Sequence, residues 1–249
     1  MSTFWLSLLL GLGAGLADYL GGFLLVRRSP SAKALRYFVA LGSGFMLSAA
    51  LLEMVPEGMA INPRWAPLLM LVGYCSVHLL EHTLVPHFHF SDPHGHFDDE
   101  THHHELISAK TSYSVLLGLA THTFFDGIAI GSGFALSNWL GWILFFAVFL
   151  HKIPEGFTVA SVMMAGGRGR SAALNSALFL GATTVAGVLV ISLAPGLVKA
   201  GLPLSAGVTI YVAATDLVPE VNREPGIRMA LVFFLGVIVF FLLRQLAPA

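Results

Sequence analysis

Charged residues are scarce in this sequence. Of its 249 residues, 13 are Lys or Arg and 14 are Asp or Glu, so that only 11% are charged. A soluble domain carries about 25% charged residues, and this chain has too few to cover a globule of its size. No basic run is longer than Arg27-Arg28 and the net charge is -1, so the phosphate contacts of nucleic-acid binding are missing as well. These shortages exclude a soluble enzyme and a nucleic-acid-binding protein.

Cysteine is nearly absent. The single Cys75 lies in an apolar run, which excludes both a disulfide framework and a Cys-type zinc finger. The chain is rich instead in apolar residues and histidine: 56% of the residues are hydrophobic, the mean hydropathy is +0.79, and 11 residues are His. A surplus of histidine in a charge-poor chain needs an explanation.

Long apolar runs divide the chain into segments that can cross a membrane. A transmembrane helix needs about 20 mainly apolar residues, and the sequence has eight such stretches between short polar or Gly/Pro-rich breaks. They are 4–26, 35–58, 66–86, 112–136, 139–164, 172–194, 203–221 and 229–247. The sequence therefore predicts an all-α polytopic integral membrane protein with eight spans. We expect a single transmembrane domain over 1–249, with a flexible His-rich loop at 87–110.

Basic residues are distributed unevenly between the loops. The loops after spans 1, 3, 5 and 7 hold nine of them: Arg27, Arg28, Lys33, Arg36, Lys110, Arg168, Arg170, Arg223 and Arg228. The opposite side holds Arg64, Lys199 and Arg244. Because basic loops stay in the cytoplasm, we predict a multi-pass protein of the plasma or inner membrane with both termini extracellular or periplasmic. The His-rich loop is then cytoplasmic.

A short motif occurs twice. The segment 52–57 (Leu-Glu-Met-Val-Pro-Glu) in the second span resembles 215–220 (Thr-Asp-Leu-Val-Pro-Glu) in the seventh. The two spans run in opposite directions, and inverted repeats are a recurrent architecture of membrane transporters. We therefore predict that helices 1–3 and 6–8 form an inverted repeat around helices 4 and 5.

Ionisable residues cluster in the two central spans. His122 and Asp126 lie four residues apart in span 4, and His151 and Glu155 repeat this spacing in span 5, so each pair shares one helical face. Ionisable residues inside a membrane are costly and mark functional sites. Imidazole and carboxylate together suit Zn²⁺, Fe²⁺ and Mn²⁺, so the two faces predict a site for a divalent metal ion near the midplane. The alternative is that these residues only form interhelical hydrogen bonds or salt bridges.

Lys152 lies in the same stretch, three residues before Glu155. It either acts as a fixed cation where a second metal ion would otherwise bind, or balances the charge of Glu155, and the two roles are compatible. Pro154 cannot donate a hydrogen bond to the carbonyl of Leu150, so we also expect a kink that frees this oxygen beside His151.

The paired motifs resemble those of a known family. His122-x-x-x-Asp126-Gly127 followed by the run 151–156 (His-Lys-Ile-Pro-Glu-Gly) resembles the signatures of the fourth and fifth helices of the ZIP (Zrt/Irt-like) metal transporters. The resemblance extends over nearly the whole chain, through the eight spans, the external termini, the His-rich loop and the Pro-Glu motifs. It implies uptake of divalent transition metal ions into the cytoplasm, zinc foremost, with Fe²⁺, Mn²⁺ and Cd²⁺ as further candidates. It also implies that the two histidines and two acids of these motifs are the transport-site ligands.

Some members of that family hold two metal ions, and this chain departs from their pattern. Thr123 stands where those members have Asn, Lys152 stands where they have an acid, and 172–194 contains no acid. The resemblance therefore implies one metal ion, with Lys152 in place of the other.

Further acidic residues lie in the outer spans. Asp18, Glu53 and Asp216 are either stepping sites along the metal path or partners of polar groups on other helices. For Glu57 and Glu220, interhelical hydrogen bonding is the favoured interpretation.

The segment 78–82 (His-Leu-Leu-Glu-His) matches the H-x-x-E-H pattern of a class of metallopeptidases. An intramembrane peptidase with Glu81 as general base is therefore a rival function. The motif lies close to the cytoplasmic end of its span and no third ligand is tied to it. We therefore expect a non-enzymatic protein in which this segment is an interfacial cluster or a metal exit step.

The loop between spans 3 and 4 holds seven histidines among acidic residues. They are His87, His89, His94, His96, His102, His103 and His104. The segment has too few apolar residues to fold alone, and its side chains would receive or sense released metal, or bind metal only incidentally. Taken together, the sequence predicts a transporter without a prosthetic group whose partners are metal ions and the lipid bilayer. It leaves open export in place of uptake, and assembly as a homodimer.

Overall fold

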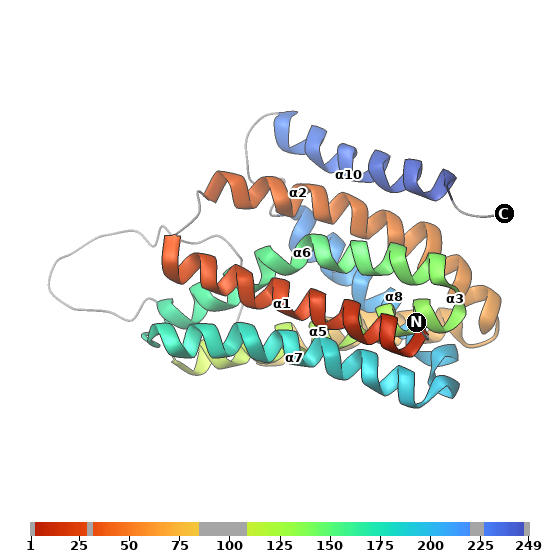
Figure 1. Ribbon diagram of the computed structural model, residues 1–249, viewed down its shortest axis with the longest axis horizontal. Helices are drawn as coiled ribbons and strands as arrows, with labels where there is room; N and C mark the ends of the chain where they lie inside the picture. The colour runs from red at the N-terminus through yellow and green to blue at the C-terminus, as the bar shows by residue number, and fades with distance from the viewer. Residues whose placement is uncertain (1–2, 29–31, 85–108, 220–226, 247–249) are drawn as a thin grey trace, which may run out of the picture.

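The computed structural model of the chain describes residues 3–28, 32–84, 109–219 and 227–246. Within these ranges all regular structure is helical and no residue lies in a strand, as the all-α prediction requires. The helices run along one common long axis (Figure 1). The seven loop histidines and Glu220 lie outside the described residues.

The helices follow the predicted order, and most ends differ from the predicted ones by a few residues. The long helices are α1 (Thr3–Arg28), α2 (Ala32–Ala49), α4 (Ala66–Leu84), α5 (Ala109–Leu136), α6 (Asn138–Ala165), α7 (Arg170–Leu193), α8 (Val198–Tyr211) and α10 (Ile227–Gln245). Shorter elements extend them. They are η1 (Ala50–Met54) and α3 (Val55–Ile61) after α2, η2 (Pro195–Leu197) before α8, and η3 (Val212–Leu217) after α8.

Seven helical stretches in the described residues are long and apolar enough to cross a membrane. They cover all or part of every long helix except α4, which spans 19 residues. His78, Glu81 and His82 occupy the last two turns of α4 and lower its mean hydropathy. The multi-pass membrane character is therefore supported, whereas the eighth span stays a prediction.

Helix α6 forms the centre of the bundle. In its apolar stretch 72% of the residues are buried inside the protein, against 17% for α10. Helices α1, α5, α7 and α2 all pack against α6. Helix α10 packs against α2 along one edge of the bundle in Figure 1, and α4 packs against α8.

Close backbone contacts hold the central helices together. A Cβ atom added to Gly15 of α1 would lie 2.7 Å from the carbonyl oxygen of Gly181 in α7, and one added to Gly181 would lie 2.4 Å from the oxygen of Gly15. Only glycine at both positions allows α1 and α7 to approach this closely.

Both Pro-Glu motifs contain a π-helical turn. The N–H of Val55 donates to the oxygen of Ala50, and the N–H of Val218 donates to the oxygen of Ala213, five residues earlier in each case. A proline follows each turn, at Pro56 and Pro219, and lacks the N–H that would continue the ordinary ladder. Wider turns of this kind occur at functional sites, and nothing in the residue pattern predicted them.

Candidate metal centre

A single residue joins α5 to α6 and sets the two helices side by side. Ser137 caps α6, because its Oγ accepts a hydrogen bond from the Leu140 N–H at 3.1 Å. The helices run in opposite directions and pack along their length. The His/Asp face of α5 therefore meets the His/Glu face of α6.

The four sequence-predicted ligands come together at this contact. His122, Asp126, His151 and Glu155 are all buried, and each offers one potential ligand atom within 4.8 Å of the others. Among the residues that the structure describes, no other group of three or more His, Cys, Asp or Glu side chains meets this condition. Two imidazoles and two carboxylates match the ligands that Zn²⁺ and related ions take from proteins.

The imidazoles are oriented toward Asp126. Nε2 of His122 lies 3.3 Å from Oδ2 of Asp126, and Nε2 of His151 lies 3.2 Å from the same oxygen. Nδ1 of His151 lies 2.9 Å from the backbone oxygen of Ala147. If Nδ1 carries the proton and donates this bond, Nε2 keeps a lone pair for a metal ion, the arrangement usual for metal-binding histidine.

Lys152 lies between the carboxylates. Its Nζ is 2.8 Å from Oδ2 of Asp126 and 2.6 Å from Oε2 of Glu155, and the side chain has no exposed surface. Nζ also donates to Oγ1 of Thr123 at 3.3 Å, and this hydroxyl donates to Glu155. The ammonium group thus contacts two of the four predicted ligands.

Asp18 of α1 completes the buried charges around this centre. It has no exposed surface, and its Oδ2 lies 3.8 Å from Nζ of Lys152. The close approach of α1 to α6 depends on Gly156, where an added Cβ atom would lie only 1.8 Å from the backbone oxygen of Asp18. The sequence singled out Asp18 but gave no reason to place it beside Lys152, because that contact joins distant parts of the chain.

The comparison with known proteins adds an independent observation. The family model described as ZIP zinc transporter matches residues 86–244, which is more than half of the chain. The chain belongs to the ZIP family.

Curated ZIP proteins are similar to parts of this chain. Mouse zinc transporter ZIP4 is 32% identical over 127 residues, which cover 49% of this chain and 19% of that protein. Human zinc transporter SLC39A7 is 30% identical over 139 residues, covering 51% and 30%. The zinc transporter zipt-7.1 of Caenorhabditis briggsae is 29% identical over 160 residues, covering 59% and 41%. The chain therefore spans less than half the length of these relatives.

Within this ZIP protein, Glu53 and Asp216 do not join the four-residue cluster. Glu53 accepts from Nε of the half-exposed Arg244 at 2.8 Å, so it has the interhelical partner that one of the two interpretations required. Asp216 accepts a hydrogen bond from the Thr215 hydroxyl at 3.0 Å. Their roles along a metal path stay predictions.

The His-Leu-Leu-Glu-His segment of this ZIP protein lies against α8. The buried hydroxyl of Tyr211 donates to Oε2 of Glu81 at 2.7 Å and lies 3.4 Å from Nδ1 of His78. The rings of His78 and His82 lie 4.0 Å apart, measured between centroids. A peptidase would need Glu81 beside a metal-bound water, whereas here it bonds to Tyr211. Nothing in the sequence singles out Tyr211, because only the fold brings it to this segment.

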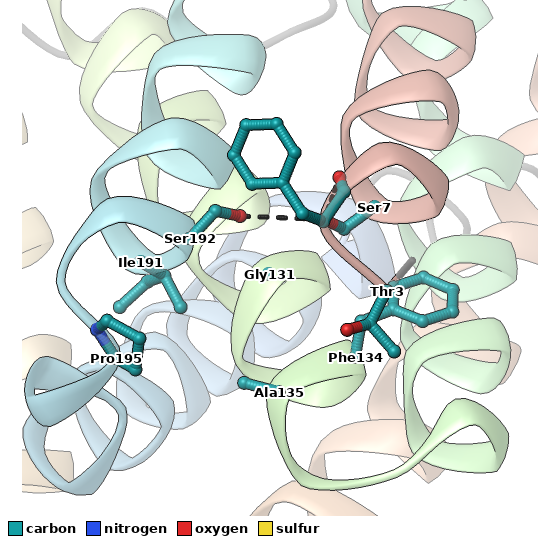
Figure 2. Close-up of a pocket in the computed structure, with 9 residues that line it drawn as sticks. Thr3, Ser7, Gly131, Phe134, Ala135, Ile191, Ser192 and Pro195 are labelled. Atoms are coloured by element: carbon teal, nitrogen blue, oxygen red, sulfur yellow. Dashed lines mark hydrogen bonds between the residues drawn. The ribbon is translucent and has the colours of Figure 1, made fainter. Parts of the chain in front are cut away.

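A pocket of about 240 Å³ lies away from the cluster. Figure 2 shows it between the first turns of α1 and parts of α5 and α7, with Ser7 and Ser192 facing each other at 3.5 Å. Its lining contains no His, Asp, Glu or Cys. Ser7 precedes Asp18 by 11 residues on α1, which is roughly 16 Å along a helix. This pocket therefore offers no metal ligand to the centre.

Proposed function

We propose that this ZIP protein carries a divalent transition metal ion, zinc foremost, across a membrane through the centre formed by His122, Asp126, His151 and Glu155. The observation that carries the proposal is the gathering of four potential ligand atoms within 4.8 Å in a buried place between two membrane-spanning helices. Four such donors suit the tetrahedral coordination of Zn²⁺. The zinc transporters among its relatives support the choice of cargo.

The ion is cargo, so the site has to bind it and let it go. Ligands hold a metal only in their deprotonated form, and Asp126 already shares one oxygen with both imidazoles and with Lys152. An arriving ion would replace these contacts by direct bonds to Asp126 and Glu155. When the ion leaves toward the opposite side of the membrane, the imidazoles and Lys152 would return to their contacts with the carboxylates.

We further propose eight spans with an inverted repeat, so that α4 crosses the membrane as well. The pattern of packing supports this. Helix α1 packs against α6 as α7 packs against α5, and α2 packs against α10 as α8 packs against α4. The first three spans are α1, α2 to α3, and α4, and the last three are α7, α8 to η3, and α10. Exchanging these two sets in order, and exchanging α5 with α6, reproduces the same contacts. The matching π-turns in η1 and η3 follow the same exchange.

Glycine contacts support the repeat in finer detail. Gly44 of α2 lies against the backbone of α10, and Gly236 of α10 lies against the backbone of α2. In the other half, Gly207 of α8 and Gly73 of α4 meet each other's helices in the same way. Gly73 follows Gly44 by 29 residues, and Gly236 follows Gly207 by 29 residues. Two halves of this kind suit alternating access, in which one bundle rocks against the other around a central site.

We propose transport toward the cytoplasm, with both termini on the outer side. The first turn of α1 and the last turn of α10 lie at the same end of the bundle (Figure 1), as an even number of crossings requires. The basic loops favour the other end as cytoplasmic. Glu81 and Asp216 lie beyond the centre toward that end, on α4 and η3, and the His-rich loop of the sequence would receive the ion after them.

Zinc uptake into vesicles that contain the purified protein tests the proposal. His122→Ala and Glu155→Ala should lose most of the uptake, because each removes one of four ligands. Ser192→Ala, in the pocket at the far end of α7, is the matched control and should keep it. Undiminished uptake in both ligand variants would contradict the assignment of the site.

The direction of flux separates uptake from export. In vesicles that have the cytoplasmic face of the protein on the inside, uptake predicts that zinc added outside accumulates in the lumen. Export predicts instead that zinc loaded into the same vesicles is released. The peptidase alternative is tested in the same preparation. Cleavage of a membrane substrate by the wild type that is lost in Glu81→Gln would argue for an enzyme.

A further inference from the structure

Asp18 is a buried acid without a hydrogen-bond partner. Neither of its carboxylate oxygens makes a hydrogen bond, although the side chain has no exposed surface. A buried carboxylate that makes no hydrogen bond is strongly unfavourable. The nearest cation is the ammonium of Lys152, at 3.8 Å, which is longer than the roughly 2.8 Å of a charge-assisted hydrogen bond.

The two halves of the protein carry different side chains at the position of Asp18. The backbone oxygen of Asp18 in α1 lies against Gly156, and that of Thr184 in α7 lies against Gly127. These two glycines directly follow the two acids of the predicted metal site. Thr184 is therefore the counterpart of Asp18, and its hydroxyl is also buried without a hydrogen-bond partner.

The residue that follows each histidine differs in the same way. On α6 it is Lys152, whose Nζ lies 3.8 Å from Asp18, and on α5 it is Thr123. One half therefore has a cation together with an acid, and the other half has a hydroxyl together with a hydroxyl. The acid Asp18 thus lies in the half that contains the Lys152 cation, which indicates that the two side chains act together.

We propose that Asp18 is the carboxylate that holds the Lys152 ammonium while a metal ion occupies Asp126 and Glu155. The proposal rests on the function proposed above. A metal ion bound to Asp126 and Glu155 would repel the ammonium, which lies 2.8 and 2.6 Å from these same side chains. Moving Nζ by about 1 Å would bring it to hydrogen-bond distance of Asp18, and the flexible lysine chain allows such a movement.

The charges support this assignment. With all three acids ionised, the carboxylates of Asp18, Asp126 and Glu155 together with the ammonium of Lys152 leave two negative charges in a buried place. With neutral imidazoles, one divalent ion cancels them. Without Asp18 the ammonium would keep one ligand carboxylate neutralised, and a divalent ion would leave an uncompensated positive charge. Asp18 is in this sense a positioning residue that acts through Lys152.

Zinc titration of the purified full chain tests the proposal, with Asp18→Asn, Lys152→Met and the double variant. Asp18→Asn should bind zinc about 10- to 100-fold more weakly, the range found for residues that support metal ligands. Lys152→Met should bind no more weakly than the wild type, because it removes the competing cation. The double variant should regain most of the affinity lost in Asp18→Asn. Thr184→Val, at the counterpart position without a charge, is the matched control and should bind as the wild type does.

Two results would overturn the proposal. One is wild-type affinity in Asp18→Asn. The other is a double variant as weak as Asp18→Asn, because a merely structural loss cannot be repaired at Lys152. His122→Ala with unchanged affinity would instead contradict the metal site itself, and a wild type that binds no zinc would contradict both.

A zinc-bound crystal structure gives a second readout. Nζ of Lys152 should lie within hydrogen-bond distance of Asp18 and away from both ligand carboxylates. An ammonium still bonded to Asp126 beside a bound ion would overturn the proposal.

Discussion

Replacing Gly156 by alanine should push α1 away from α6. The added Cβ atom would lie 1.8 Å from the backbone oxygen of Asp18, whereas close C···O contacts are about 3.3 Å or longer. Because the contact involves the backbones of both helices, no side chain can move aside and the helices themselves must separate. The separation needed is about 1.5 Å, the difference between the two distances. Overfilling a packed interior costs about 1–3 kcal/mol, and the better helix propensity of alanine returns up to about 1 kcal/mol of this.

We therefore expect Gly156→Ala to lower the free energy of unfolding by on the order of 1–2 kcal/mol and to reduce zinc uptake. The separation moves Asp18 from Lys152 and shifts Glu155 on the same turn of α6. A displacement of about 1 Å at a positioned group can cost on the order of 100-fold in rate, so uptake should fall by at least about tenfold.

Thermal unfolding of the purified protein and zinc uptake in vesicles measure the two effects. Gly13→Ala is the matched control, because an added Cβ atom at Gly13 of α1 meets nothing within 4 Å. This control should be as stable as the wild type or slightly more so, with unchanged uptake. If Gly156→Ala equals the wild type in both measurements, the argument that this backbone contact positions the centre is refuted.

Three further predictions follow from other parts of the structure. Zinc titration should give one intramembrane ion per wild-type chain, counted apart from any zinc on the seven loop histidines, because we propose that Lys152 takes the place of a second metal ion; two intramembrane ions per chain would contradict this. Tyr211→Phe removes the 2.7 Å hydrogen bond to Glu81 and should lower the free energy of unfolding by about 1 kcal/mol, whereas an unchanged unfolding midpoint would show the bond to be dispensable. Arg244→Met breaks the ion pair with Glu53 at a half-exposed position and should change the free energy of unfolding by less than about 1 kcal/mol; a larger loss would mean that the pair is shielded from water.

The sequence predicted which side chains come together when they lie within one helix or across one short connection. The spacing of His122 and Asp126, repeated in His151 and Glu155, fixes a common helical face, and the single residue Ser137 between α5 and α6 brings the faces together. The all-helical membrane architecture followed from composition. These features depend on local geometry, which the spacing of residues along the chain determines.

Features that depend on contacts between distant helices could not be predicted in the same way. Asp18 faces Lys152 because α1 packs on α6 at Gly156, and no periodicity of either helix reveals this pairing. Tyr211 meets Glu81 for the same reason. The π-turns also escaped prediction, because a proline signals an interrupted ladder but not how the chain repairs it.

The pairing of Asp18 with Lys152 has a consequence for related sequences. If the acid serves the cation, the two positions should have changed together during the divergence of the family. Relatives with a neutral or acidic residue in place of Lys152 should then have no need of an acid in place of Asp18. In an alignment of many relatives, the acid at the position of Asp18 and the cation at the position of Lys152 should therefore be present together or absent together.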